Sequence, residues 1–162
     1  MFPLRTLASV FVVTVVCLPL FAGAEVPGPT VYRNVSSAAL ERVLGDLNIQ
    51  FRKSTGNKPA IHFYDFTRNG YTIRLHNYEG NDLWIEALCT NRLSLDEVNR
   101  WNQRAKFSRC VRLENNNKVT VSLENQFDAR GGCTDAIVRQ FILRFDNEVR
   151  TFDGFVEKLQ AR

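Results

Sequence analysis

Apolar residues recur at helical spacing in three stretches of this chain of 162 residues. Before the first stretch, Ser36 or Ser37 can act as a helix N-cap, because a hydroxyl oxygen accepts a hydrogen bond from the free backbone N–H groups of the first turn. The apolar face of this first helix would consist of Leu40, Val43, Leu44 and Leu47.

The last of the three stretches is the longest. Thr134 is a plausible N-cap for it, and Asp135 suits the positive end of a helix. The apolar positions that follow alternate steps of four and three residues: Val138, Ile142, Phe145, Val149, Phe152, Val156 and Leu159. Further apolar residues widen this stripe, which suits a helix that covers a sheet better than one in a coiled-coil seam. We therefore predict that this helix packs on its own domain, with a helical dimer seam as the alternative.

The middle stretch is shorter and has a well-marked beginning. Ser94 followed three residues later by Glu97 matches the capping box, in which each residue satisfies a backbone N–H group of the other. Leu93 and Val98 stand at the positions of a hydrophobic staple, and Trp101 falls on the same helix face as Val98. The pattern predicts a short amphipathic helix with a large aromatic residue on its buried side.

Alternating apolar and polar residues surround Asn69-Gly70, a dipeptide that strongly indicates a two-residue β-hairpin turn. This turn would set Tyr64 opposite Leu75 on an apolar face and Phe63 opposite His76 on the other face. Because the turn and the hydrophobic pattern agree, they support one register.

A three-residue loop at 79–81 would add a third strand to this hairpin and would set Trp84 beside His76. The resulting row of Phe63, His76 and Trp84 lies on the outer face of the predicted sheet. If no helix covers that face, the row is a candidate partner-binding surface. The alternative is that the first or the middle helix packs on it and makes a second core.

After the middle helix, residues 107–114 and 118–124 have the pattern of a second pair of strands. A three-residue loop at 115–117 would set Val111 opposite Val121 and would turn Cys110 to the outer face. Residues 49–53 add at most one short strand. The order α-β-β-β-β-α-β-β-α predicts an α+β fold, with an antiparallel sheet of five to six strands and the long C-terminal helix packed on it.

The first 24 residues differ in character from the rest. Arg5 precedes a nearly continuous apolar run, and Ala22-Gly23-Ala24 has the small-residue pattern of a cleavage site, which predicts a secretory signal peptide cleaved after Ala24. A transmembrane anchor is the less favoured alternative, because the run is shorter than about 18 residues. Residues 25–35 contain two prolines and a glycine and suggest an extended arm, so the folded domain would span 36–162.

Charge and motifs exclude several classes of function. Removal of the signal peptide leaves 20 basic and 17 acidic side chains, a net charge of +3. No run of Lys or Arg is long enough to indicate binding to nucleic acid or to an anionic membrane. The sequence also lacks a phosphate-binding glycine loop and the common hydrolase motifs. We therefore expect no cofactor, no nucleic-acid partner and no insertion into a membrane after cleavage.

The positions of the histidines and cysteines give little support for a catalytic or metal site. The predicted register sends His62 and His76 to opposite faces of the sheet, so they cannot share a metal ion. Cys110 with His76 is the remaining candidate for an enzyme, which ranks third among the functions considered. In an exported chain, the three cysteines left after cleavage allow one disulfide and one free thiol. Cys89 on the core face and Cys110 on the outer face are a disfavoured pair, whereas Cys89 with Cys133 stays open.

The run Leu93-Ser94-Leu95-Asp96-Glu97-Val98-Asn99-Arg100-Trp101-Asn102, with Lys106-Phe107 and the later Gly131-Gly132-Cys133-Thr134, resembles the YbjN-domain family. Members of this family are described as regulators of bacterial sensory transduction. The residues that match its pattern are Asn99, Trp101, Asn102, Phe107, Gly131 and Gly132. The likeness extends over about residues 40–156. Cys110 and Cys133 depart from the pattern, since Ala and Val are more usual there.

The resemblance implies a fold like that of type III secretion chaperones, no enzymatic activity and, for a member with a signal peptide, a periplasmic location. We expect Asn99 and Asn102 to hydrogen-bond backbone groups at the helix-to-strand junction in preference to binding a ligand. The protein would then be an exported, non-enzymatic protein-binding module, chaperone-like or regulatory. The alternative is an envelope scaffold that forms a homodimer through the C-terminal helix.

Overall fold

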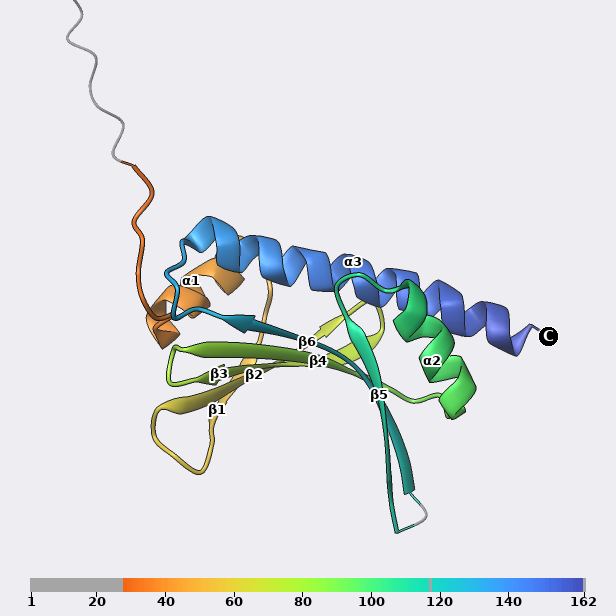
Figure 1. Ribbon diagram of the computed structural model, residues 1–162. Coiled ribbons are helices and arrows are strands. Elements are labelled where there is room, and N and C mark those ends of the chain that lie inside the picture. Colours follow the sequence, from red (N-terminus) through yellow and green to blue (C-terminus); the bar gives the residue numbers. More distant parts are fainter. Residues whose placement is uncertain (1–27, 117, 162) are drawn as a thin grey trace, which may run out of the picture.

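The computed structural model describes residues 28–116 and 118–161, so the predicted signal peptide and its cleavage site lie outside the described residues. Within the described part the elements follow in this order: α1 (Ser37–Asp46), β1 (Arg52–Thr55), β2 (Ile61–Arg68), β3 (Tyr71–Tyr78), β4 (Asp82–Cys89), α2 (Leu95–Arg104), β5 (Arg109–Asn115), β6 (Lys118–Asp128) and α3 (Asp135–Gln160). This is the predicted order, and the predicted α+β class is confirmed (Figure 1). The division of the chain into signal, arm and domain stays a prediction.

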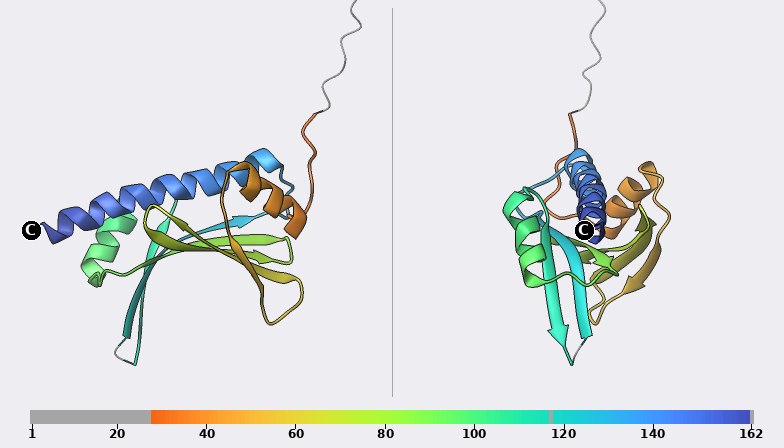
Figure 2. Two further views of the ribbon diagram at one scale, coloured as in Figure 1. Left: turned by 180° about the vertical axis from the view of Figure 1, so that it is seen from behind. Right: turned by 90° about the vertical axis from the view of Figure 1, so that its right-hand side faces the viewer.

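The strands of the described chain form one antiparallel sheet of six strands in the order β1-β2-β3-β4-β6-β5. The three helices lie on one face of this sheet. Figure 1 and Figure 2 show α3 running along the sheet, with α1 near one end of it and α2 near the other. No described helix lies over the opposite face, and the β5–β6 hairpin projects away from the helices. We call this uncovered side the open face.

The apolar stripe of α3 is buried within its own domain, as predicted. Its buried residues are Val138, Phe141, Ile142, Phe145, Val149, Phe152, Phe155 and Val156. The indole of Trp101 on α2 meets the Phe152 ring edge to face, with centroids 4.9 Å apart, so α2 and α3 share one core. Because the stripe is used in this way, it cannot also serve as the seam of a helical dimer.

The short helix α2 begins and ends on the hydrogen bonds that its sequence indicates. The Ser94 backbone N–H donates to Glu97 Oε2 at 2.8 Å, and the Glu97 N–H donates to Ser94 Oγ at 3.3 Å, which completes the predicted capping box. At the other end, the Asn102 side chain accepts from the Cys110 N–H at 2.8 Å and donates to the Cys110 carbonyl at 3.0 Å. The expectation for Asn102 is confirmed, whereas Asn99 is exposed and its side chain has no hydrogen bond to the described residues.

The register of the first three-strand unit is confirmed. Phe63 faces His76 and His76 faces Trp84, while Tyr64 faces Leu75 on the core side. Asn69 and Gly70 have φ of 50° and 78°, the left-handed pair that a type I′ turn requires.

The predicted register of β5 and β6 is wrong by one residue. Val111 faces Ser122 and not Val121, because Asn115 pairs with Lys118 and the loop therefore holds two residues. Asn116 adopts a φ of 47°, which asparagine tolerates better than most residues and which makes the tighter turn accessible. As a consequence Cys110 faces Leu123 on the core side, contrary to prediction, and Val111 turns to the open face.

Two strands begin or end at other residues than predicted. The first begins at Arg52, because Asn48 has a φ of 53° and turns the chain so that Ile49 packs into the core, with its N–H bonded to the Leu44 carbonyl at 3.0 Å. β6 continues to Asp128, four residues beyond the predicted end, since its second half pairs with β4.

Candidate functional site

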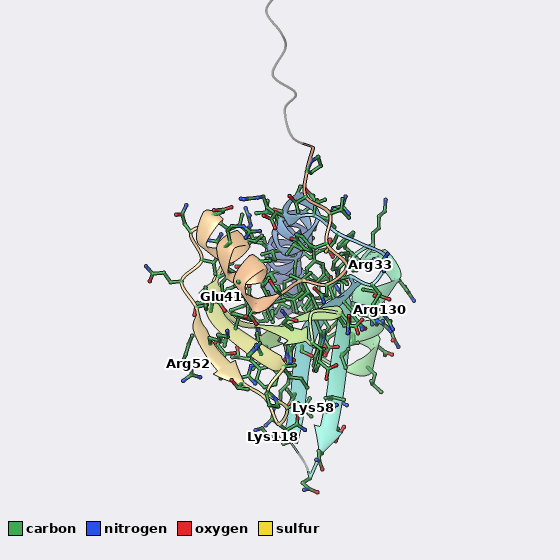
Figure 3. All side chains as sticks on the ribbon, turned by 90° about the vertical axis from the view of Figure 1, so that its left-hand side faces the viewer. Arg33, Glu41, Arg52, Lys58, Lys118 and Arg130 are labelled. Atoms are coloured by element: carbon green, nitrogen blue, oxygen red, sulfur yellow. The ribbon has the colours of Figure 1, made fainter. Side chains whose placement is uncertain are left out.

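The open face carries the outward side chains of the central strands, which face one another in rows. Its main members are Phe63 and Asp65 of β2, Arg74, His76 and Tyr78 of β3, Trp84, Glu86 and Leu88 of β4, Val111 and Leu113 of β5, and Ser122, Glu124 and Gln126 of β6. Basic side chains stand at the margins of the sheet, among them Arg52, Lys58 and Lys118 (Figure 3).

The predicted aromatic row packs as one unit on this face. The imidazole of His76 stacks on the indole of Trp84 with centroids 4.3 Å apart, and the ring of Phe63 meets His76 edge-on at 5.0 Å. Tyr78 also stacks on His76, with centroids 5.7 Å apart. No described helix covers the row, so the alternative of a second core beneath α1 or α2 is not what the structure contains.

His76 is only 6% exposed although it lies on the open face, because the neighbouring rings cover it. Its two ring nitrogens are also engaged: Nε2 lies 3.0 Å from Glu86 Oε1, and Nδ1 lies 3.3 Å from the Tyr78 hydroxyl. Phe63 and Trp84 are half-buried and supply the accessible surface of the row. His76 therefore acts as the spacer that holds the two larger rings in place.

A charged row runs beside the aromatic one. Arg74 donates to both carboxylate oxygens of Asp65, from Nε at 2.6 Å and from Nη2 at 3.1 Å, and Arg52 approaches the same carboxylate at 3.3 Å. Hydrogen bonding to Arg74 holds the pKa of the Asp65 carboxyl below its ordinary value. The Arg74 guanidinium also lies 5.5 Å from the centre of the Phe63 ring, which joins the two rows.

Exposed aliphatic residues extend the open face onto the β5–β6 hairpin. Leu88 on β4 is 46% exposed, and Leu113 on β5 is 61% exposed. Val111 lies on the same face of β5, two residues before Leu113. Sequence reasoning missed Val111 and Leu113, because the wrong register assigned them to the core. The signal that points to them is the adjacent Asn116-Asn117 pair, which suits a two-residue turn.

In the part of the chain that the structure describes, the histidines and cysteines do not assemble into a reactive site. His62 and His76 lie on opposite faces, as predicted, and the described residues contain no group of three or more metal-binding side chains. Cys110 lies on the core side and His76 on the open face, so the candidate Cys110–His76 pair does not form. Burial raises the pKa of the Cys110 thiol to about 12, which leaves it protonated and unreactive at neutral pH.

The Cys89–Cys133 disulfide that the sequence left open is not formed, and both residues are buried free thiols, as is Cys110. Cys133 precedes α3 and exchanges two backbone hydrogen bonds of 2.9 Å with Tyr32. Cys89 ends β4, where Asn91 and Asp153 near the other end of α3 influence its thiol. The length of α3 separates the two cysteines, so no local rearrangement joins them.

Most of the residues that match the family pattern have a role in the fold itself. Trp101 is 1% exposed, and Gly132 has a φ of 94°, in the region that glycine adopts without strain. Phe107 differs, because it is 37% exposed, with the Arg144 guanidinium 4.8 Å from the centre of its ring.

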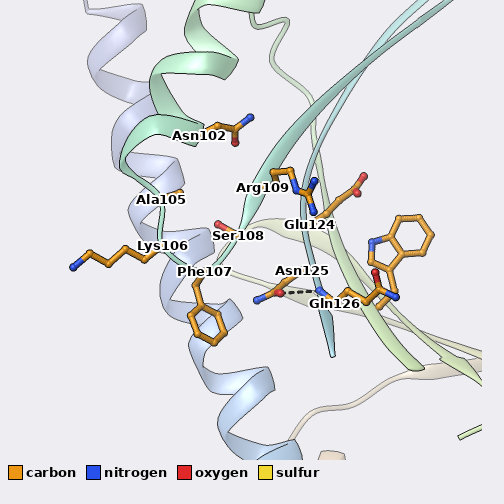
Figure 4. A pocket seen from close by; sticks show the side chains of 10 residues that line it. Asn102, Ala105, Lys106, Phe107, Ser108, Arg109, Glu124, Asn125 and Gln126 are labelled. Atoms are coloured by element: carbon orange, nitrogen blue, oxygen red, sulfur yellow. Dashed lines mark hydrogen bonds between the residues drawn. The ribbon is translucent and has the colours of Figure 1, made fainter. Parts of the chain in front are cut away.

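Phe107 lies between two hollows of about 340 and 620 Å³ at the end of β6. The smaller one lies toward the open face and includes Trp84 and Arg109 (Figure 4). The larger one lies toward α3 and includes Ile137 and Phe141. Both are lined by Lys106, Phe107, Asn125 and Gln126, and we call the two together the β6-end groove.

No protein-family model matches this sequence, and no curated protein matches it either. Among solved structures, the fold is similar to that of the Yersinia pestis type III secretion chaperone SycH, crystallised in complex with a stable fragment of YscM2. The two chains are 14% identical, the match covers 72% of this chain and 98% of SycH, and the TM-score is 0.46. Residue roles are not transferred from SycH at this level of likeness. Among residues 28–116 and 118–161, no helix has the length and apolar character needed to cross a membrane.

Proposed function

We propose that this protein is a non-enzymatic protein-binding module that contacts its partner through the open face. The observation that carries the proposal is that one whole side of the sheet has no described helix over it and yet presents Phe63, Trp84, Leu88 and Leu113. A sheet face that faces water alone normally carries polar side chains. Aromatic and aliphatic residues gathered on such a face mark surfaces that bind other proteins.

The arrangement of the open face also has the anatomy of a binding surface. Its centre is aromatic, and Trp and Tyr are the residue types that most often dominate binding energy. Charged side chains of Asp65, Arg74 and Glu86 stand beside this centre, where they can screen it from water and select the partner by charge.

We further propose that the module belongs with the YbjN-domain proteins, is exported with cleavage after Ala24 and works in the periplasm in a chaperone-like or regulatory role. The family proposal rests on the sequence pattern alone, which includes Trp101 and Asn102. The proposal of export rests on the sequence of residues 1–24 alone. Mass measurement of the chain recovered from the periplasm tests it, with a mature N-terminus at Glu25 expected and the intact chain as the contrary result.

Site-specific photocrosslinking in the native host tests the role of the open face. A photoreactive residue in place of Leu88 should give a covalent adduct of discrete mass. The matched control replaces Leu95, which is 60% exposed but lies on α2, on the helical side. Trp84→Ala should abolish the adduct at Leu88 without loss of the far-ultraviolet circular dichroism. Adducts of equal yield from both positions, or an adduct from Leu95 alone, would refute the proposal.

A further inference from the structure

The end of β6 is a strand edge without a neighbour. β5 pairs with residues 118–124 of β6, whereas β4 pairs with residues 121–128. Residues 125–128 therefore have a strand on one side and none in the described chain on the other. The backbone N–H of Gln126 donates to the side-chain oxygen of Asn125 at 2.7 Å, a local bond that replaces a partner strand.

This edge differs from the other free edges of the sheet. The outer strands carry cationic side chains, Arg52 and Lys53 on β1 and Arg109 and Arg112 on β5. Such charges oppose the addition of a further strand. From Asn125 to Phe127 the edge of β6 has no charged residue, and Asp128 at its end is paired with Arg130 at 2.8 Å. The fold thus leaves one short edge without cationic side chains open to pairing.

The β6-end groove flanks this edge on both sides. Toward α3 it is apolar, with Phe127, Phe141 and the 44% exposed Ile137. Toward the open face it is polar and includes Arg109. The side-chain nitrogen of Asn125, between the two, is buried and has no hydrogen-bond partner in the described chain. Successive side chains of an extended peptide point to opposite sides, so apolar and polar residues in alternation fit this groove.

The charged residues along the groove determine which polar side chains that peptide should carry. Lys106, Arg109 and Arg144 lie along it, and none of them forms an ion pair with another described residue. Glu124 also lines the smaller hollow and faces Arg109 across the β5–β6 pair, and its hydrogen bond from Ser122 Oγ at 2.6 Å leaves its negative charge in place. Three cations against this one lining carboxylate leave an excess of positive charge, which favours an acidic occupant.

We propose that the β6-end groove binds an extended acidic segment of a partner protein, with alternating acidic and apolar residues, which adds to the sheet as a strand beside residues 125–128 of β6. The edge is four residues long, so about four residues of the segment pair, over roughly 14 Å. Its apolar side chains lie against Ile137 and Phe141, and its carboxylates lie toward Lys106 and Arg109. The inference deepens the proposed protein-binding function but uses a largely separate set of residues, with Trp84, Glu124 and Gln126 at the border of the two surfaces.

A labelled peptide tests the proposal, with the sequence Gly-Ser-Glu-Ile-Glu-Val-Asp-Ile-Ser and fluorescence anisotropy as the readout. The counterpart peptide has Lys at every acidic position. Saturable binding of the acidic peptide alone is expected, together with slower hydrogen exchange of the Gln126 amide. Arg109→Glu should weaken binding by about tenfold, whereas Lys118→Glu, an equal charge reversal at the hairpin tip, should change it less than about twofold.

Backbone methylation separates strand addition from simple attraction. In an added strand, alternate N–H groups face β6, so methylating one alternate set of peptide nitrogens should abolish binding and methylating the other set should leave it. Equal affinity of both methylated peptides, binding of the lysine peptide, or no binding of the acidic peptide would each overturn the inference. Phe63→Ala should not affect peptide affinity, and the crosslink at Leu88 does not depend on the peptide, so failure of one proposal leaves the other standing.

Discussion

Asn102→Ala is the change whose effect the structure defines best. The Asn102 side chain closes the junction of α2 and β5 with two hydrogen bonds to one residue, of 2.8 and 3.0 Å to the N–H and carbonyl of Cys110. Asn99 belongs to the same helix and the same family pattern, but it is exposed and its side chain is not bonded to the described residues. Asn99→Ala is therefore a matched control.

The magnitude follows from the two bonds and from the burial of their partner. Each hydrogen bond contributes about 1 kcal/mol net, and each buried backbone group left without a partner costs about 1–3 kcal/mol. Cys110 is 2% exposed, so its backbone has little access to water from the core side. Asn102 itself is half-buried, which allows water to replace part of the loss. We expect Asn102→Ala to lower the free energy of unfolding by about 2–4 kcal/mol, a large share of the stability of an ordinary domain.

Urea denaturation followed by circular dichroism measures both variants. Asn99→Ala should stay within about 0.5 kcal/mol of the parent, and the dependence on urea concentration should be unchanged in both. Equal losses for the two variants would mean that helix propensity or an unrecognised contact of Asn99 sets the stability. A loss below about 0.5 kcal/mol for Asn102→Ala would refute the structural role given to this residue.

Other parts of the fold give further expectations. Phe152→Ala should destabilise by about 3–5 kcal/mol in the same assay, because a ring that is 1% exposed leaves a cavity beside Trp101. For the chain that begins at Glu25, thiol titration of the native protein should find no rapidly reacting cysteine. Titration in denaturant without a reducing agent should find three thiols, and a single thiol under that condition would indicate a disulfide. The hydrogen bond from Tyr32 and the ion pair with Arg42 hold the pKa of Asp135 below its ordinary value. Their stabilisation is present above about pH 4 and is lost as the pH falls through the lowered pKa, so Asp135→Asn should flatten the acid limb of a plot of urea midpoint against pH.

Local chemistry explains why so much of the fold is predictable from sequence. The Asn69-Gly70 turn forces one pairing of β2 with β3, and that pairing agrees with the apolar face that the core needs. The capping box and the apolar stripe likewise define α2 and α3, because each signal is read from residues three or four positions apart in the chain. The aromatic row of the candidate site follows directly from the same registers.

The errors lie where two arrangements differ little in local energy. Around 115–117, loops of two and three residues both satisfy an alternating pattern, and on a hairpin that projects from the body neither face needs to be apolar. The choice then depends on the backbone of Asn116 and on contacts of β6 with β4, which are distant in sequence. The dependence on β4 likewise hides the last four residues of β6, the unpaired edge beside them and the β6-end groove.

The aromatic row is ordered before any partner arrives, and this property bears on how the open face can bind. Phe63 and Trp84 are held by contact with His76, and His76 is held in turn by Glu86 and Tyr78. Association usually costs about 0.5–1.5 kcal/mol for each flexible side chain that becomes immobilised. Rings that already restrain one another avoid most of that cost, so a small accessible area can contribute more to affinity than its size suggests. An open sheet face built only from exposed leucines would lack this advantage, which is a physical reason for a buried histidine to stand at the centre of an uncovered surface.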